Sequence, residues 1–284
     1  MRRDKTMFDA SVVRAQAAQL RVLIIEMLTA AGSGHPGGSL SSADIVSTLY
    51  FGDVLRHDPH DPEDPSRDRF VLSKGHAAPV QYGALALAGY IDKAELPKLR
   101  SLGAMLQGHP DALQTPGIEV STGSLGQGLS IACGMAQALK LDGEGQRVFC
   151  LLGDGELQEG QIWEAAMYAA HYGLDNLTAI VDNNNLQIDG KTDQVMDLGD
   201  IARKFEAFGW DVTSVDGHDV EALHEALTLA LTPNRPRVIV AMTIKGCGVS
   251  FMEDKAQWHG NAPSADQAIQ ACDEIRCACG EGIL

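Results

Sequence analysis

Two polar clusters, each directly behind an apolar run, hold residue types that bind metals and phosphates. Gly153-Asp154-Gly155 follows residues 148–152, and Asp182-Asn183-Asn184 follows residues 177–181. Short runs rich in β-branched and apolar residues are typical of buried parallel strands. Residues 161–172 between the clusters have the length and composition of a crossover helix, which predicts a strand–helix–strand unit.

This unit predicts that the two clusters meet in space. The carboxyl ends of both strands of a right-handed βαβ unit lie at one edge of the sheet, so we expect Asp154 to approach the Asn183/Asn184 pair. A few oxygen ligands combined with a ligand phosphate suit Mg²⁺, and the glycines beside Asp154 allow close approach of a diphosphate. A tight turn after a strand would explain Gly-Asp-Gly alone, but it leaves the second cluster unexplained.

Four histidines stand beside glycine or proline in similar segments: His35, His76, His109 and His259. A single histidine is usually structural, whereas four in comparable loops favour a shared polar site.

A glycine-rich segment, Gly123-Ser124-Leu125-Gly126, precedes an apolar-periodic stretch at 129–141 that predicts a helix. Its amides are therefore expected to face a ligand at the helix N-terminus. Dinucleotide sites use similar glycines. The sequence lacks the early strand–glycine loop–helix unit, followed by a ribose-binding acid, that such a site requires.

Together these motifs resemble the N-terminal, diphosphate-binding half of transketolase, and the resemblance covers residues 10–263. It implies Mg²⁺ held by Asp154, Asn184 and the backbone carbonyl of Leu186. It also implies that the four histidines surround the thiazolium ring and the donor sugar, where they act as catalytic residues that bind hydroxyls and carry protons.

The same resemblance implies a set of residues that bind thiamine diphosphate: His76, Gly123, Ser124, Leu125, Gly126, Gly153, Asp154, Gly155, Glu159, Glu164, Asn184 and His259. Glu159 and Glu164 match family carboxylates that join two active sites through a subunit interface. Their alternative interpretation is that they are solvated helix carboxylates.

Length and composition predict a single α/β domain over residues 1–284, with an open, mostly parallel doubly wound sheet and helices on both faces. The chain has 284 residues, 45% of them apolar, and no composition break marks a linker. Further elements are expected as helices at 12–31 and 220–231, strands at 70–72, 210–215 and 238–244, and an amphipathic stretch at 265–275.

Charge and cysteine usage restrict the partners and the compartment. The formal net charge of −16 argues against nucleic acid and anionic membrane surfaces. The charged start of the chain carries no apolar signal core, and polar residues interrupt the helix expected at 12–31, so neither secretion nor membrane insertion is supported. The six cysteines lack zinc-site spacing, which favours reduced thiols in a cytoplasmic protein.

The resemblance also implies a partner. Thiamine diphosphate chemistry needs a glutamate beside the aminopyrimidine ring, which the family carries in a pyrimidine-binding domain, and this chain stops before any such domain. Arginines that could bind sugar phosphates are few and mostly outside the motif loops. We therefore expect one subunit of a split transketolase, which moves a two-carbon ketol unit between a ketose phosphate and an aldose phosphate. A separate polypeptide would supply the pyrimidine-binding and C-terminal domains in an α2β2 assembly.

Two other functions stay open. One is a related subunit that acts on a different ketose, or that joins an acyl unit to an aldehyde as 1-deoxyxylulose-5-phosphate synthase does. The other is a non-catalytic subunit that stores the cofactor or regulates an enzyme. His109 and the Trp258-His259-Gly260 segment favour a ketose donor, and the filled metal and histidine positions argue against a non-catalytic role.

Overall fold

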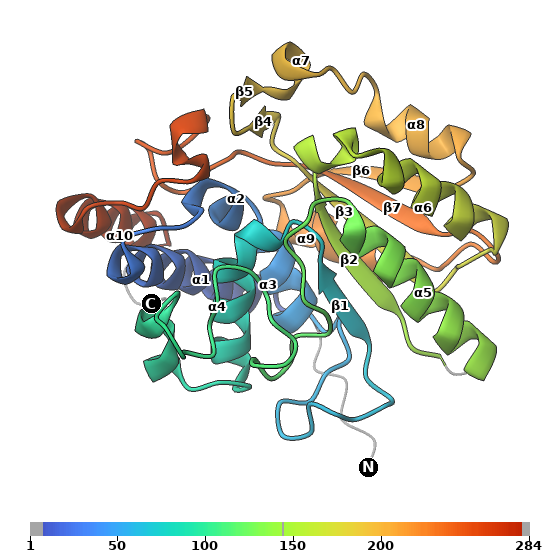
Figure 1. Ribbon diagram of the computed structural model, residues 1–284, viewed down its shortest axis with the longest axis horizontal. Coiled ribbons are helices and arrows are strands. Elements are labelled where there is room, and N and C mark those ends of the chain that lie inside the picture. The colour runs from blue at the N-terminus through green and yellow to red at the C-terminus, as the bar shows by residue number, and fades with distance from the viewer. Residues whose placement is uncertain (1–7, 144, 280–284) are drawn as a thin grey trace.

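A parallel β-sheet forms the centre of the molecule (Figure 1). The computed structural model describes residues 8–143 and 145–279. Five parallel strands pair in the order β1-β2-β3-β7-β6, which confirms the expected open parallel sheet. The strands are β1 (Arg69–Leu72), β2 (Val148–Gly153), β3 (Leu177–Asn183), β6 (Asp211–Asp216) and β7 (Arg237–Met242). A small antiparallel pair, β4 (Leu186–Gln187) and β5 (Gly190–Lys191), lies beyond the end of β3.

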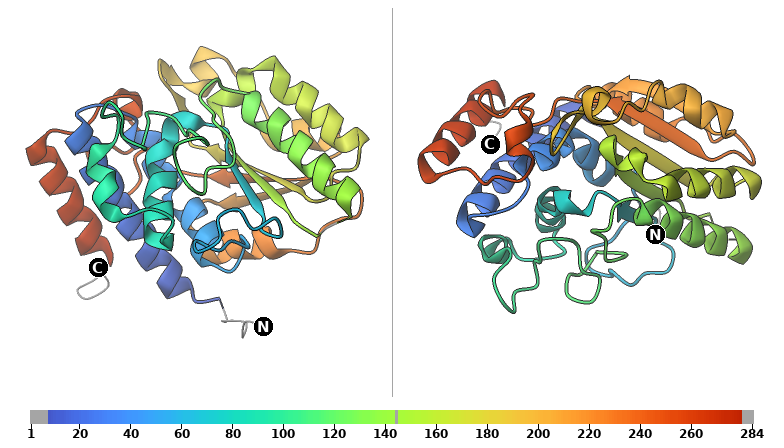
Figure 2. Two further views of the ribbon diagram at one scale, coloured as in Figure 1. Left: turned by 60° about the horizontal axis from the view of Figure 1, so that its bottom comes forward. Right: turned by 45° about the horizontal axis from the view of Figure 1, so that its top comes forward.

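Helices cover both faces of the sheet, as the doubly wound fold requires (Figures 1 and 2). The helices are α1 (Ala10–Ala31), α2 (Pro36–Ser41), α3 (Ala43–Phe51), α4 (Ala78–Ala88), α5 (Gln127–Asp142), α6 (Gly160–His171), α7 (Thr192–Val195), α8 (Ile201–Ala207), α9 (Val220–Thr228) and α10 (Ala265–Cys279). Short 3-10 helices occur at Gly75–Ala77, Lys93–Lys98, Gly155–Gln158 and Ala256–His259.

Side chains alternate between the two faces of the sheet along each strand, and this divides the core into two layers. Phe149 and Leu151 of β2 belong to the layer that contains buried residues of α1, α3, α4 and α9. Cys150 and Leu152 point to the opposite face and pack with α5, α6 and α8. Because successive side chains of a strand face opposite ways, a strand that is apolar throughout must be covered on both sides.

The expected elements are present, with shifted ends. β3 continues to Asn183, two residues beyond the predicted strand, and α9 ends at Thr228, before the predicted residue 231. The amphipathic stretch forms α10, which packs against α1 (Figure 1). The charged start and the glycine-ended tail lie outside the described residues.

Two further sequence expectations concern membranes and thiols. In the described part of the chain, no helix has the length and apolar character needed to cross a membrane. Cys133, Cys150 and Cys272 are buried free thiols. The side chain of Cys279 lies outside the described part.

Candidate cofactor and substrate site

The metal ligands expected from the sequence line one cavity of about 290 Å³ at the carboxyl ends of β2 and β3. Asp154 directly follows β2 and is only 2% exposed, and its backbone N–H donates to the carbonyl of Asp182 at 3.2 Å. Asn184 and Leu186 follow β3 and line the same cavity. The topology therefore brings Asp154 and Asn184 to one edge, as the strand–helix–strand interpretation predicts.

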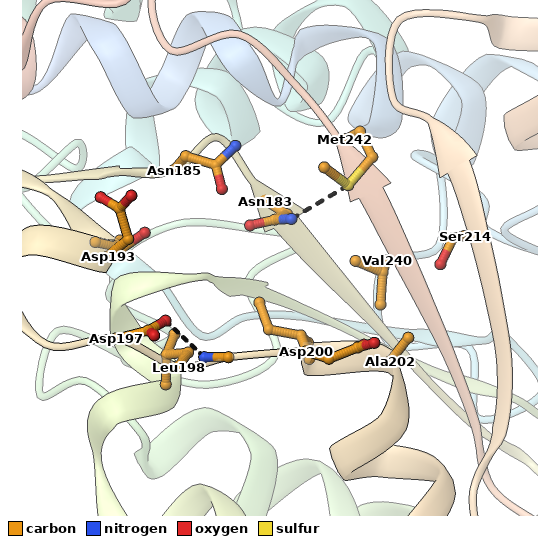
Figure 3. Close-up of a pocket in the computed structure, with 13 residues that line it drawn as sticks. Asn183, Asn185, Asp193, Asp197, Leu198, Asp200, Ala202, Ser214, Val240 and Met242 are labelled. Atoms are coloured by element: carbon orange, nitrogen blue, oxygen red, sulfur yellow. Dashed lines mark hydrogen bonds between the residues drawn. The ribbon is translucent and has the colours of Figure 1, made fainter.

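Asn183 does not join them, and the expectation for this half of the asparagine pair is wrong. Its carboxamide Nδ2 donates to the Sδ atom of Met242 at 3.2 Å (Figure 3). It lines a separate cavity of about 330 Å³, together with Asp193 and Asp197. The reason is that β3 extends through Asn183. Successive side chains of a strand point to opposite faces, so Asn183 points away from the side on which Asp182 and Asn184 lie.

Asp182, which has no solvent exposure, orients the carboxamide of Asn184. Asn184 Nδ2 donates to Asp182 Oδ2 at 3.1 Å, and the same oxygen accepts from Ser41 Oγ at 2.7 Å and from the Lys74 ammonium. Burial alone would raise the pKa of the Asp182 carboxyl, but Lys74 and the hydroxyl donors hold it below its usual value. Asp182 is therefore an ionised support for a metal ligand, a role the sequence interpretation missed.

The donor set fits a divalent cation. Burial, and next the charge of Asp182, raise the pKa of Asp154 to about 6. No ion pair within the described ranges involves Asp154, so a buried carboxylate faces the cavity without a bound counter-charge. Carboxylate, carboxamide and carbonyl oxygens at Asp154, Asn184 and Leu186 are the ligand types that Mg²⁺ accepts.

Two buried lysines, which sequence reasoning missed, give the cavity positive charge. Lys74 and Lys245 are 1% and 2% exposed, and both line the cavity. Lys245 Nζ donates to the carbonyl of Leu186 at 3.3 Å, and burial followed by the charge of Lys74 lowers its pKa to about 8. These positions fit an anionic diphosphate. The sequence does carry a signal for these lysines, because they follow β1 and β7 and so lie at the same sheet edge as Asp154.

Glu156 ties the glycine-rich loop to the metal loop. Its Oε1 atom accepts from the backbone N–H of Gly126 at 2.8 Å, and its Oε2 atom from that of Gly153 at 3.0 Å. The expectation that the loop amides face a ligand is therefore wrong for Gly126, because a buried protein carboxylate already occupies its N–H. Of the loop residues 123–126, Leu125 lines the cavity.

Three of the predicted histidines form a compact cluster beside the cavity. The ring centroids of His35, His76 and His259 lie 5.0 to 5.6 Å from one another. His109 packs against Gly123, where a Cβ atom would come within 3.2 Å of its ring. The glycine thus gives His109 room to stand at the exposed side of the site.

The clustered imidazoles are neutral at physiological pH. Burial, with smaller contributions from nearby cations, lowers the pKa of His35 to about 4 and that of His259 to about 3, and it lowers the pKa of His76 as well. The Nδ1 atoms of His35 and His259 are buried and have no hydrogen-bond partner among the residues that the structure describes. Such atoms fit a ligand that supplies the missing hydrogen bonds.

The remaining predicted residues divide between the cavity and the surface. Gly153, Gly155 and Glu159 line the cavity, with Glu159 at the N-terminus of α6. Glu164 lies farther along α6, is exposed, and does not line it. Its role at a subunit interface stays a prediction.

A family model described as "Transketolase, thiamine diphosphate binding domain" matches residues 12–277. Human transketolase is 47% identical over 265 residues, which are 91% of this chain and 41% of that protein. The chain therefore spans less than half the length of such relatives.

Shorter relatives match along most of their length. An apulose-4-phosphate transketolase subunit of Phocaeicola vulgatus is 42% identical over 268 residues, 94% of this chain and 95% of that protein. The 6-deoxy-6-sulfo-D-fructose transketolase subunit SqwG of Clostridium sp. is 46% identical over 245 residues, 86% of this chain and 89% of that protein.

Solved structures agree with the sequence relatives. Transketolase from Campylobacter jejuni superposes with a TM-score of 0.88 at 36% identity, over 94% of this chain and 43% of that one. Fold, motif positions and family model lead to one assignment: the chain belongs to the transketolase family and corresponds to its thiamine diphosphate binding domain.

Proposed function

We propose that this chain is the diphosphate-binding subunit of a split transketolase, which transfers a two-carbon ketol unit from a ketose phosphate to an aldose phosphate. The observation that carries the proposal is the direct adjacency of two arrangements. In the described part of the chain, a cavity that holds two lysines and Asp154, which makes no ion pair there, lies beside neutral histidines whose buried Nδ1 atoms lack hydrogen-bond partners.

The residues of the cavity would hold the cofactor. Asp154, Asn184 and the carbonyl of Leu186 would bind Mg²⁺, and Lys74 and Lys245 would offset the charge of the diphosphate. Thiamine diphosphate, when bound, supplies the carbon nucleophile and the electron sink that ketol transfer requires. Asp182 keeps Asn184 oriented, so the metal ligands need little rearrangement when the cation enters.

The histidines would act on the sugar oxygens. A neutral imidazole can accept a proton from a hydroxyl or donate a hydrogen bond to a carbonyl oxygen. The depressed pKa values of His35 and His259 keep both rings in this neutral form. Exposed His109 lies where it can contact the part of the sugar that projects toward solvent.

A second polypeptide would complete the enzyme. Relatives named as transketolase subunits match this chain over nearly their full length, which supports a separate partner with the pyrimidine-binding and C-terminal domains. We propose a twofold α2β2 assembly, with Glu159 and Glu164 near the subunit interface. The free cysteines of the described ranges favour a reducing compartment, so we propose that the enzyme acts in the cytoplasm.

A label-transfer assay tests the reaction. The chain and its candidate partner would be combined with thiamine diphosphate, Mg²⁺, an aldose phosphate and a ketose phosphate labelled with ¹³C at its first two carbons. Ketol transfer places both labels together in the lengthened sugar. Turnover of pyruvate instead of the ketose would support the synthase-like function, and no turnover of either donor would contradict both enzymatic functions.

A further inference from the structure

Arg100 lies between two of the histidine loops. A Cβ atom on Gly34, beside His35, would stand 3.9 Å from Arg100 Nε, and one on Gly108, beside His109, would stand 2.9 Å from Arg100 Nη2. Gly108 therefore leaves room for the guanidinium, whereas the distance at Gly34 is ordinary van der Waals contact. The guanidinium also donates from Nη1 to Ser33 Oγ at 3.4 Å.

In the described part of the chain, the guanidinium has no acidic partner. Arg100 makes no ion pair within residues 8–143 and 145–279, whereas most other arginines of these ranges do. A backbone turn holds the residue in place, with φ of 63° and its N–H donating to the carbonyl of Leu106 at 2.9 Å. In a chain of formal net charge −16, an exposed guanidinium without a carboxylate is available to an external anion.

This charge is separate from the charges that face the cofactor cavity. Lys74 and Lys245 line that cavity, and Arg100 does not. Its neighbours are instead His35 and His109, and its positive charge contributes, after burial, to the lowered pKa of both imidazoles. The site thus has two cationic positions, one at the metal end and one beside the histidines expected to face the sugar.

We propose that Arg100 binds the anionic end of the sugar substrate, a phosphate or a sulfonate, while the adjacent histidines contact its hydroxyls. This inference rests on the proposed function. A planar guanidinium matches two oxygens of a tetrahedral anion, and phosphate and sulfonate both present such a pair. Arg100 would be one of the few arginines of this chain that could bind a sugar phosphate.

A binding experiment on the full chain tests Arg100 without turnover. Inorganic phosphate would be titrated while the imidazole signals of His35 and His109 are followed by NMR. We expect both signals to shift, with about a tenfold weaker affinity in Arg100→Gln, which loses a charge-assisted hydrogen bond. Arg100→Lys should retain part of the affinity, and Arg276→Gln, a change of an exposed arginine on α10, should retain all of it. Equal affinity in Arg100→Gln and the native chain would overturn the proposal.

A kinetic experiment with the partner present separates substrate binding from positioning of the histidines. Arg100→Gln should lower kcat/KM about tenfold for a ketose phosphate and a ketose sulfonate, and leave the neutral ketose almost unchanged. Equal losses for charged and neutral ketoses would overturn the proposal, because Arg100 would then act only by holding the histidines. If the native assembly turns over no ketose, the proposed function fails, and the phosphate titration still decides whether Arg100 is an anion site.

Discussion

The two ends of the site differ in how complete they are within this chain. At the cofactor end, Asp154, Asp182, Lys74 and Lys245 are each at most 2% exposed and are held by protein hydrogen bonds. At the sugar end, Arg100 and His109 are exposed, and the buried Nδ1 atoms of His35 and His259 have no hydrogen-bond partner within residues 8–143 and 145–279.

The difference has a physical reason. Strand ends fix the cofactor end, because the sheet register places Gly153 beside Asp182 and Asn183 beside Met242. The sugar end is built from loops and short turns, whose polar groups a ligand or a second polypeptide can still satisfy. The chain therefore prearranges metal and diphosphate binding and leaves substrate binding to be completed.

The largest effect is expected at the buried ion pair of the cofactor end. Lys74→Met leaves Asp182 charged and unpaired in the core, which should lower the free energy of unfolding by about 3–5 kcal/mol. Chemical denaturation measures it, with Lys98→Met, a change of an exposed lysine, as the control. A loss as small as that of the control would mean that the cofactor end is not held by this pair.

Removal of a metal ligand should affect binding more than folding. Asp154→Ala should weaken Mg²⁺-dependent binding of thiamine diphosphate by more than about 100-fold. Loss of a group that only supports a metal ligand weakens binding by up to about 100-fold, and loss of the ligand itself should weaken it more. Burial raises the pKa of Asp154, so removal of the buried charge is favourable, whereas loss of the hydrogen bonds from the Gly155 and Asn185 amides is unfavourable. Because the two effects oppose each other, the melting temperature should change little. Calorimetry with Asp197→Ala as the control checks both expectations, and unchanged affinity would exclude Asp154 as a ligand.

His109 should show the reverse balance at the sugar end. His109→Ala should lower kcat/KM by about 10- to 100-fold, because hydrogen bonding or proton transfer at a sugar oxygen is lost. The unfolding midpoint should stay almost constant, since the ring is exposed and Gly123 packs against it without a side chain. Steady-state kinetics and thermal unfolding together test this, and lost stability with full activity would support a structural role.

The smallest effect concerns the pH dependence of His35. Its pKa in the fold is about 4, below the usual value near 6.5, so the unfolded chain takes up a proton first as pH falls. Stability from His35 is therefore full above about pH 6.5 and decreases toward about pH 4. His35→Gln should flatten this decrease by less than about 1 kcal/mol, because the ring is partly exposed and screened. Denaturation curves at several pH values would show no flattening if His35 is protonated in the fold.

The sequence predicts the parts of the site that follow a recognisable strand. Apolar runs locate β2 and β3, and their shared edge brings Asp154 to Asn184. If the predicted end of β3 had been two residues later, the alternation of side chains along the strand would also have predicted that Asn183 points away from Asn184.

Other parts have no local signal. Helices α2 and α4 are buried on nearly every side, so their sequences lack the polar face that periodicity needs. The approach of Arg100 to the loops of His35 and His109 depends on long-range packing, which spacing along the chain does not encode. The hydrogen bond from the Gly126 amide to the Glu156 carboxylate is equally non-local. Because of it, the expectation that this amide faces a ligand is wrong.

Ketol transfer by the isolated chain, compared with the chain plus its partner, tests the central claim most directly. Each preparation would receive thiamine diphosphate, Mg²⁺, a ketose phosphate and an aldose phosphate, and product formation would be followed at equal chain concentrations. We expect no transfer by the chain alone and transfer when the partner is added, because under the proposed function the partner would supply the glutamate that activates the cofactor. Turnover by the isolated chain at the rate of the mixture would contradict the claim that this chain needs a second polypeptide for catalysis.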